Sequence, residues 1–235
     1  MIRLDKLLAH NGYGTRKEVK QMIRSGQVKI DNELIKNDDY RINENEVEIK
    51  INDEIIEYRN QIYLMMNKPK GYVCANDDQW HLTVFDLLDN LNTSKLFCVG
   101  RLDLDTTGLL IITNDGQLAH NLISPKKQIK KVYEVLITGK LRTDDFKLFE
   151  NGVIIGDGYK CLPAVLELKE EYSESSLVNV TIQEGKFHQI KMMFKAIGLT
   201  VLELKRLKIG NLELDQSLEL GEYRFLTDDE LKKIS

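Results

Sequence analysis

The sequence predicts an α+β protein with two domains, a small one at the start of the chain and a larger one after it. The chain has 235 residues, more than the roughly 100 to 150 of a typical single domain. Helix-like and strand-like segments occur in both parts, and a polar, acidic stretch separates them. We therefore expect a first domain at residues 1–51, a linker at residues 52–60 and a second domain at residues 61–235.

The composition is that of a globular protein, with 42% hydrophobic and 30% charged residues. No apolar run approaches the roughly 18 to 20 residues that a membrane span needs, and the N-terminus lacks the long apolar core of a secretion signal. We therefore expect a cytoplasmic monomer without a membrane partner. The cysteines Cys74, Cys98 and Cys161 are single and widely spaced, which favours buried thiols over a disulfide framework or a structural zinc site.

The first domain is predicted to contain two helices followed by short strands. Leu4, Leu7 and Leu8 have helical spacing, and a capping box over residues 15–18 begins a second helix. Strands are predicted at residues 28–30 and 47–49, with a turn at residues 31–32. The second helix carries a basic stripe, formed by Arg16, Lys17, Lys20 and Arg24.

The second domain is predicted to contain mostly strands and a few helices. Strand-like runs lie at residues 63–66, 109–113, 132–138, 164–168 and 177–182. Helices are predicted at residues 84–88, 117–123, 143–149 and 186–197, and a capping box over residues 227–230 predicts one more. The helix at residues 186–197 has an apolar face, Phe187, Ile190, Phe194 and Ile197, and a cationic face, His188, Lys191 and Lys195.

The net charge of −4 taken alone counts against a nucleic-acid partner, because phosphate neutralisation supplies most non-specific affinity. The charge is segregated, however. Residues 1–30 hold seven basic and two acidic residues, residues 185–210 hold six and one, and residues 121–133 hold four lysines and no acid. Acidic segments at residues 31–60 and in the last 25 residues hide this excess. Such asymmetry is typical of a protein with one anionic partner, although a run of lysines can also be an ordinary solvated surface.

The segment of residues 100–108 is the densest candidate for chemistry. It lies between an apolar run and a strand-like run, so we expect Asp103 on a loop held at both ends, where functional residues commonly occur. Asp103 and Asp105 could instead be turn or cap residues that bind backbone N–H groups, and for Asp105 we favour that interpretation. Lys191, on the cationic face of the later helix, is a reasonable partner for the Asp103 carboxylate.

Other chemistries find less support. The histidines His10, His81, His120 and His188 lie on separate elements without metal-ligand spacing, and we see no nucleophile elbow and no Gly-rich phosphate loop after a strand. A glycoside hydrolase that uses Asp103 and Asp105 is a weaker alternative, because residues i and i+2 do not define a carboxyl separation.

Five motifs occur in one order along the chain, at residues 67–72, 100–110, 131–133, 184–191 and 221–224. Together they resemble the signature of pseudouridine synthases of the RsuA/RluB type, and the resemblance covers nearly the whole chain. Residues 1–50 resemble the alpha-L RNA-binding module that precedes the catalytic domain in this family. The resemblance implies a catalytic domain with a mixed, largely antiparallel sheet and flanking helices. Residues 71–74 and 105–107 are most similar to the small-subunit enzymes, which isomerise uridine 516 of 16S rRNA.

The resemblance also implies residue roles. Asp103 would be the catalytic aspartate, Lys191 the cation paired with it, and Tyr133 the aromatic residue packed on the target base. Arg101 would fill the space left by the flipped nucleotide, and Leu204 would be the apolar pocket residue, although Leu202 lies two positions away on the same strand face. In the first domain we expect Arg3 and the basic stripe, Arg16, Lys17, Lys20 and Arg24, to bind RNA.

The implied activity is the isomerisation of a uridine in 16S rRNA to pseudouridine. The base must leave the stack, at a cost of roughly a few kcal/mol, before its bond to the sugar can be remade. The aspartate could attack C1′ or C6, or act as a base at C2′; none of these routes requires a metal, a nucleotide or a redox cofactor, so we expect no cofactor. Two alternatives stay open: a 23S rRNA target, and a catalytically silent rRNA-binding assembly factor. The RNA could also be an assembly intermediate that carries ribosomal proteins.

Overall fold

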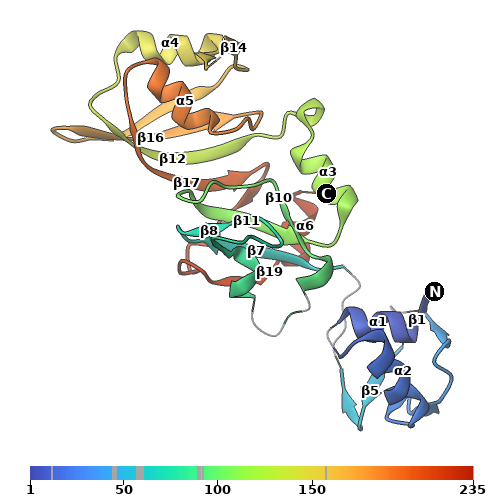
Figure 1. Cartoon of the computed structure of the whole chain (residues 1–235). Helices are drawn as coiled ribbons and strands as arrows, with labels where there is room; N and C mark the ends of the chain where they lie inside the picture. Colours follow the sequence, from blue (N-terminus) through green and yellow to red (C-terminus); the bar gives the residue numbers. More distant parts are fainter. Residues whose placement is uncertain are drawn as a thin grey trace. The chain divides into compact units, whose positions relative to one another are not determined.

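The computed structural model describes residues 1–11, 13–43, 47–56, 61–88, 91, 93–156 and 158–234. Its internal contacts divide the chain into two compact units (Figure 1): Met1–Ile62 with Leu88–Lys95, and Tyr63–Leu87 with Leu96–Ser235. Each unit has a hydrophobic core of its own.

The first unit packs two helices on a small antiparallel sheet. The helices are α1 (Leu4–His10) and α2 (Arg16–Arg24). The sheet has the order β3 (Glu33–Ile35), β2 (Val28–Ile30), β5 (Ile49–Ile51) and β6 (Glu54–Ile55), and a separate pair joins β1 (Ile2–Arg3) to β4 (Arg41–Ile42). The predicted capping box is present, because the Thr15 hydroxyl accepts from the Glu18 N–H and the Glu18 carboxylate accepts from the Thr15 N–H.

Two expectations for the first unit need correction. The strand predicted at residues 47–49 is shifted and spans Ile49–Ile51. Asn52 and Asp53, with φ of 50° and 69°, turn the chain into β6, which pairs with β5. The linker expected at residues 52–60 therefore does not begin at residue 52, because residues 52–55 complete the sheet; residues 57–60 lie outside the described residues.

The second unit is built on a mixed sheet, in which nine strands are described. The central order is β15 (Val165–Glu171), β16 (Ser175–Ile182), β12 (Lys131–Thr138), β17 (Val201–Ile209), β11 (Thr107–Thr113), β7 (Tyr63–Lys68) and β19 (Tyr223–Phe225); β10 (Phe97–Val99) pairs with β11, and β18 (Leu212–Glu213) with β17. Within this sheet β11 and β17 run parallel and the other described pairs run antiparallel. The expected mixed, largely antiparallel sheet is thus confirmed.

Helices flank this sheet. α3 (Gly116–Ile123) and the residues after α6 (Asp228–Lys232) share a core with β10, β11 and β18. α4 (Thr143–Asn151) meets α5 (Gln189–Ala196) through Phe149 and Phe194, whose ring centroids lie 5.3 Å apart. Smaller elements of this unit are two strand pairs, β8 (Tyr72–Val73) with β9 (Leu82–Thr83) and β13 (Ile154–Ile155) with β14 (Tyr159–Lys160). It also has 3-10 turns at Val84–Leu87 and Pro125–Lys127, and a further 3-10 turn at Thr93–Lys95 belongs to the first unit.

The helix predicted at residues 186–197 begins later than its periodicity indicates. His188 has a left-handed backbone with φ of 49°, so the helix begins at Gln189. Phe187 consequently lies outside the helix and is 77% exposed, rather than on its buried face. The helix predicted at residues 84–88 is a 3-10 turn over Val84–Leu87.

A close approach explains one glycine of the motif at residues 100–110. Gly108 lies where β11 enters its parallel pairing with β17, opposite Arg206, and has φ of 99°. A Cβ atom at Gly108 would lie 2.3 Å from the Arg206 carbonyl oxygen. Only glycine allows both this contact and this backbone conformation.

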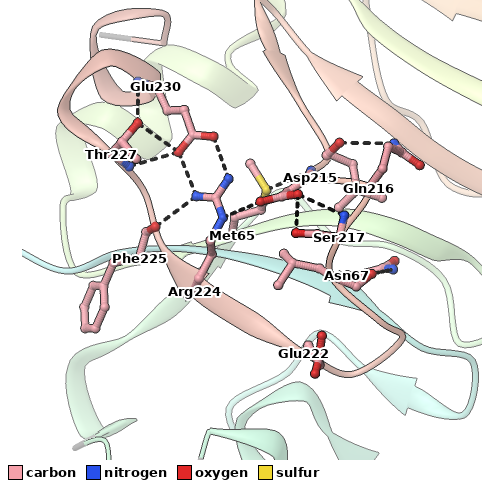
Figure 2. A network of polar contacts seen from close by, with 12 residues as sticks. Met65, Asn67, Asp215, Gln216, Ser217, Glu222, Arg224, Phe225, Thr227 and Glu230 are labelled. Atoms are coloured by element: carbon pink, nitrogen blue, oxygen red, sulfur yellow. Dashed lines mark hydrogen bonds and ion pairs between the residues drawn. The ribbon is translucent and has the colours of Figure 1, made fainter.

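A polar network ties the C-terminal segment to β7 (Figure 2). Arg224 lies between two carboxylates: its Nε donates to Asp215 Oδ2 at 2.7 Å, and its Nη1 and Nη2 donate to Glu230 at 2.8 and 2.7 Å. The Asn67 N–H donates to the Glu222 carbonyl oxygen and the Asn67 side chain to the Leu218 carbonyl oxygen. The motif at residues 221–224 therefore supports the end of β7, from which Lys68 reaches the candidate site.

Candidate active site

A small cleft with a volume of about 80 Å³ opens in the second unit, beside the strands β12 and β17 and the loop before β11. All five residues that the sequence analysis assigned to the site of the second domain line this cleft. The lining comprises Arg101, Leu102, Asp103, Thr106, Tyr133, Ile182, Gly185, Lys186, His188, Gln189, Ile190, Lys191 and Leu204.

The Asp103 carboxylate contacts the cation that the sequence analysis proposed as its partner. Lys191, on α5, places its Nζ 3.1 Å from Asp103 Oδ2. The same Nζ lies 2.5 Å from Asp105 Oδ1. Asp105 is therefore more than the turn residue we favoured, because its carboxylate shares Lys191 with Asp103.

The pKa shifts of Lys191 and Asp105 keep both side chains charged at neutral pH. Burial alone lowers the pKa of Lys191, but its hydrogen bonds to Asp105 and Asp103 outweigh burial, so that its pKa lies above the usual 10.5. Burial raises the pKa of Asp105, but the hydrogen bond and the charge of Lys191, together with smaller contributions, outweigh it, so that its pKa lies below the usual 3.8. The Lys191 ammonium therefore stays charged and offsets the carboxylates.

A second, buried lysine fixes the loop from behind. Lys68, at the end of β7, is fully buried, and its Nζ donates to the carbonyl oxygens of Asp103, Thr106 and Pro69, each at 3.0 Å. Burial lowers the pKa of this ammonium. Lys68 lies within the motif at residues 67–72, and no role was predicted for it; a lysine that ends an apolar strand-like run was the available signal.

Sulfur and guanidinium groups lie behind the same loop. The Leu102 N–H donates to Cys74 Sγ at 3.4 Å. The Cys98 thiol also donates to Cys74; this bond lowers the pKa of Cys74, with help from Lys68 and Arg206, and raises the pKa of Cys98. Arg206 is buried and its Nε donates to the Leu109 carbonyl oxygen of β11 at 2.8 Å, so it fixes the strand that follows the loop.

The apolar walls of the cleft come from β12 and β17. Tyr133 is 8% exposed and Leu204 is 6% exposed, whereas Leu202 is 50% exposed. We expected Leu202 and Leu204 on the same strand face, and this prediction is wrong. A register shift between Leu136 and Ile137 leaves Leu202 in a bulge of β17. Leu204 is thus the residue that reaches the cleft, while Arg101 lies exposed on its rim.

A clamped loop forms the remaining wall. The buried Glu184 carboxylate accepts from the Leu162 N–H, the Tyr159 hydroxyl and Gln189 Nε2 at 2.7 to 2.9 Å. Gln189 Oε1 in turn accepts from the Lys186 N–H at 2.9 Å. His188, which lies between Lys186 and Gln189 in the sequence, places its Nε2 3.7 Å from Asp103 Oδ1. This contact was not predicted from the sequence.

Comparison with known proteins agrees with this arrangement. Residues 62–196 match the model of the RNA pseudouridylate synthase family, and residues 2–47 match the S4 domain. The chain belongs to the RNA pseudouridylate synthase family. As a pseudouridine synthase it has the two-part organisation, S4 domain then synthase domain, that the motifs implied.

Relatives of this pseudouridine synthase match it over nearly its whole length. It is 47% identical to the uncharacterized RNA pseudouridine synthase YtzG of Bacillus subtilis, over 98% of this chain and 97% of that one. It is 40% identical to ribosomal small subunit pseudouridine synthase A of Haemophilus influenzae, over 99% of both. A crystal structure of a pseudouridylate synthase, 40% identical, superposes over the whole of both chains with a TM-score of 0.70.

The S4 domain of this synthase pairs most of its expected RNA-binding side chains with acids. The buried Asp5 carboxylate accepts from Arg3 and from Arg16 Nη2, and Lys20 Nζ lies 3.8 Å away. Burial raises the pKa of Asp5, but the Arg3 hydrogen bonds and the charges of Arg3 and Arg16 hold it below its usual value. Lys20 and Arg24 both pair with Asp38, at 3.3 and 3.1 Å. Lys17, on the same helix, is exposed.

Within the described residues, no cluster of three or more His, Cys, Asp or Glu side chains could hold a metal ion. In that same part of the chain no helix is long and apolar enough to cross a membrane. Cys74 and Cys161 are buried, Cys98 is half-buried, and all three are free thiols.

Proposed function

We propose that this synthase converts one uridine of 16S rRNA to pseudouridine and that Asp103 is the residue that reacts with it. The contact of 3.1 Å between Asp103 and Lys191, in a cleft walled by Tyr133 and Leu204, carries this proposal. The choice of 16S rRNA rests on the relative named ribosomal small subunit pseudouridine synthase A, 40% identical over 99% of both chains.

The cleft is suited to a base that has left its stack. Extrusion of a nucleotide costs roughly a few kcal/mol, which protein contacts must offset. Tyr133 offers an aromatic surface and Leu204 an apolar one inside the cleft, and the exposed Arg101 on the rim is placed to fill the vacancy in the RNA. The extruded uracil then lies against the Asp103 carboxylate.

The reaction moves one bond of the uridine. The C1′–N1 bond breaks, the uracil rotates, a bond from C5 to C1′ forms, the proton at C5 passes to solvent, and N1 takes up a proton from solvent. Asp103 acts as nucleophile at C1′ or C6, or as base at C2′. Lys191 offsets the charge of the carboxylate before and after this step, while Lys68 fixes the backbone of the loop.

The S4 domain docks the ribosomal RNA. Its basic residues Arg3, Arg16, Lys17, Lys20 and Arg24 lie on or beside α2, and the side chains of Arg16 and Arg24 are 58% and 66% exposed. Phosphates that displace Asp5 or Asp38 from these side chains would gain charge-assisted hydrogen bonds.

The test is release of tritium from RNA labelled at C5 of uridine. Purified protein is mixed with 16S rRNA, with 23S rRNA and with small-subunit assembly intermediates. We expect release equal to one uridine per 16S rRNA, and loss of one pseudouridine from 16S rRNA in a deletion strain. Release from 23S rRNA alone would contradict the target, and release from none of these RNAs would contradict the activity and favour a silent assembly factor.

A further inference from the structure

An exposed aromatic side chain stands at the edge of the cleft without a role in the proposed reaction. Phe187 is 77% exposed, which leaves most of its ring in contact with water. Its ring stacks on the imidazole of His188, with centroids 3.8 Å apart and planes 19° from parallel. One face of Phe187 is thus supported by His188, and His188 itself approaches Asp103.

The loop that carries Phe187 is rigidly held. Gln189 joins its two ends, because its Nε2 donates to Glu184 and its Oε1 accepts from the Lys186 N–H. The Tyr159 hydroxyl and the Leu162 N–H also donate to Glu184 and anchor the loop to the segment before β15. The left-handed backbone of His188 is sparsely populated by residues other than glycine and is retained only where its surroundings enforce it. An aromatic ring exposed on such a fixed loop is preorganised for binding rather than loosely placed.

Phe187 lines a second hollow that adjoins the cleft; we call it the Phe187 hollow. It shares Arg101, Asp103 and Lys186 with the cleft and is continuous with it. Asp78, the other acid in its lining, is engaged by the N–H groups of Trp80 and His81. The complete lining is Val73, Cys74, Ala75, Asp78, Arg101, Leu102, Asp103, Leu104, Gly185, Lys186, Phe187 and His188.

We propose that the Phe187 hollow is a binding subsite for the nucleotide next to the target uridine, whose base stacks on Phe187 while Lys186 contacts the phosphate between the two nucleotides. This inference rests on the proposed function. Single-stranded bases bind proteins through aromatic stacking combined with cationic contacts to the backbone, which is the combination present here. Because every base has a stacking face, the subsite fixes the position of the strand and tolerates different bases.

The experiment places 2-aminopurine, whose fluorescence is quenched by stacking, on either side of the target uridine. Two fragments of 16S rRNA carry it immediately 5′ or immediately 3′ of the uridine that the wild-type protein modifies. Each is bound to wild type, Phe187→Leu, Phe187→Tyr and a control, Tyr172→Leu. Tyr172 is 45% exposed and lies outside the lining of both the cleft and the hollow.

We expect quenching by wild type in one of the two fragments, lost in Phe187→Leu and kept in Phe187→Tyr and Tyr172→Leu. Loss of one stacked base should also lower kcat/KM of Phe187→Leu by about 10-fold or more, mainly through KM. Phe187 is exposed, so the folded state of the variant is checked by an unchanged melting temperature.

Equal fluorescence and equal KM for wild type and Phe187→Leu on both fragments would overturn the subsite. Tritium release by wild type in the same preparation would leave the proposed function standing, so the two failures are distinguishable. Equal loss in Phe187→Leu and Phe187→Tyr would also overturn it, because stacking requires only the ring.

Discussion

The ammonium group of the buried Lys68 donates a hydrogen bond of 3.0 Å to the backbone carbonyl oxygen of Asp103. Two more bonds from the same Nζ reach the carbonyl oxygens of Thr106 and Pro69. The loop that carries the reacting carboxylate is therefore held by one cation at its backbone, and by Lys191 at its side chain. Lys68 and Lys191 therefore have different roles, and substitution of each lysine should affect the enzyme in a different way.

Removal of Lys68 should displace the loop without touching the carboxylate. We expect Lys68→Met to lower the single-turnover rate by on the order of 100-fold, because small misplacements of a reacting group are costly. It should lower the free energy of unfolding by about 2 to 4 kcal/mol, since three buried carbonyl oxygens lose a charged donor. The control is Lys70→Met, a half-exposed lysine that pairs with Glu203 at 3.5 Å. A wild-type rate in Lys68→Met would contradict the positioning role.

Removal of Lys191 should act on the carboxylates directly. We expect Lys191→Met to lower the single-turnover rate by on the order of 100-fold, and Lys191→Arg to retain much of it, because a guanidinium can pair with both carboxylates. Lys195→Met, one turn further along α5 and exposed, is the control. Equal rates in Lys191→Met and Lys195→Met would exclude this role.

The ion pair also predicts a pH dependence. The pKa of Lys191 is raised above 10.5, so its contribution to stability is complete below that pH and is lost as pH rises through the folded-state pKa. The pKa of Asp105 is depressed below 3.8, so its contribution is complete above that pH and is lost as pH falls through the folded-state pKa. The difference in unfolding free energy between wild type and Lys191→Met should therefore be constant from about pH 5 to pH 9. A difference that changes steadily across this range in urea titrations would contradict the assignment.

The Arg224 network predicts acid sensitivity. The Arg224 hydrogen bonds lower the pKa of Glu230 to about 2; bonds from Ser217, and then from Arg224, lower that of Asp215 to about 2. Both values are depressed, so the stability they contribute is complete above about pH 5 and is lost as pH falls toward 2. In Arg224→Met we expect a lower melting temperature at pH 7 and a shallower decline between pH 5 and pH 2. The control is Lys232→Met, which removes an exposed ion pair with Asp229. It should leave unchanged both the melting temperature at pH 7 and its decline between pH 5 and pH 2.

The basic stripe of the S4 domain predicts a salt dependence. Arg16→Ala combined with Lys20→Ala should weaken rRNA affinity and flatten the plot of log affinity against log salt by about 0.7 to 0.9 per lost phosphate contact. The matched control is Lys140→Ala with Lys169→Ala, two paired surface lysines of the second unit. An unchanged slope in the first variant would exclude this helix as the docking surface.

Much of this architecture could be predicted from the sequence. The capping box at Thr15 and Glu18 located α2, because that pattern is local. The pairing of Asp103 with Lys191 could be predicted because the two residues lie in recognisable motifs, although only the fold places them 3.1 Å apart. Features that depend on backbone irregularity were missed: the left-handed His188 that excludes Phe187 from α5, and the bulge that separates Leu202 from Leu204. Burial of the Lys68 ammonium was missed because its acceptors are backbone carbonyl groups of a distant loop, which leave no trace in side-chain patterns.

Substitution of the two neighbouring carboxylates tests the central claim most directly. Asp103→Asn and Asp105→Asn are nearly isosteric changes, and both residues contact Lys191. Tritium release from 16S rRNA labelled at C5 of uridine is measured for each, together with binding of the same RNA. We predict that Asp103→Asn binds the RNA and releases no tritium, whereas Asp105→Asn retains most of the release. Tritium release by Asp103→Asn at the rate of Asp105→Asn would contradict the account.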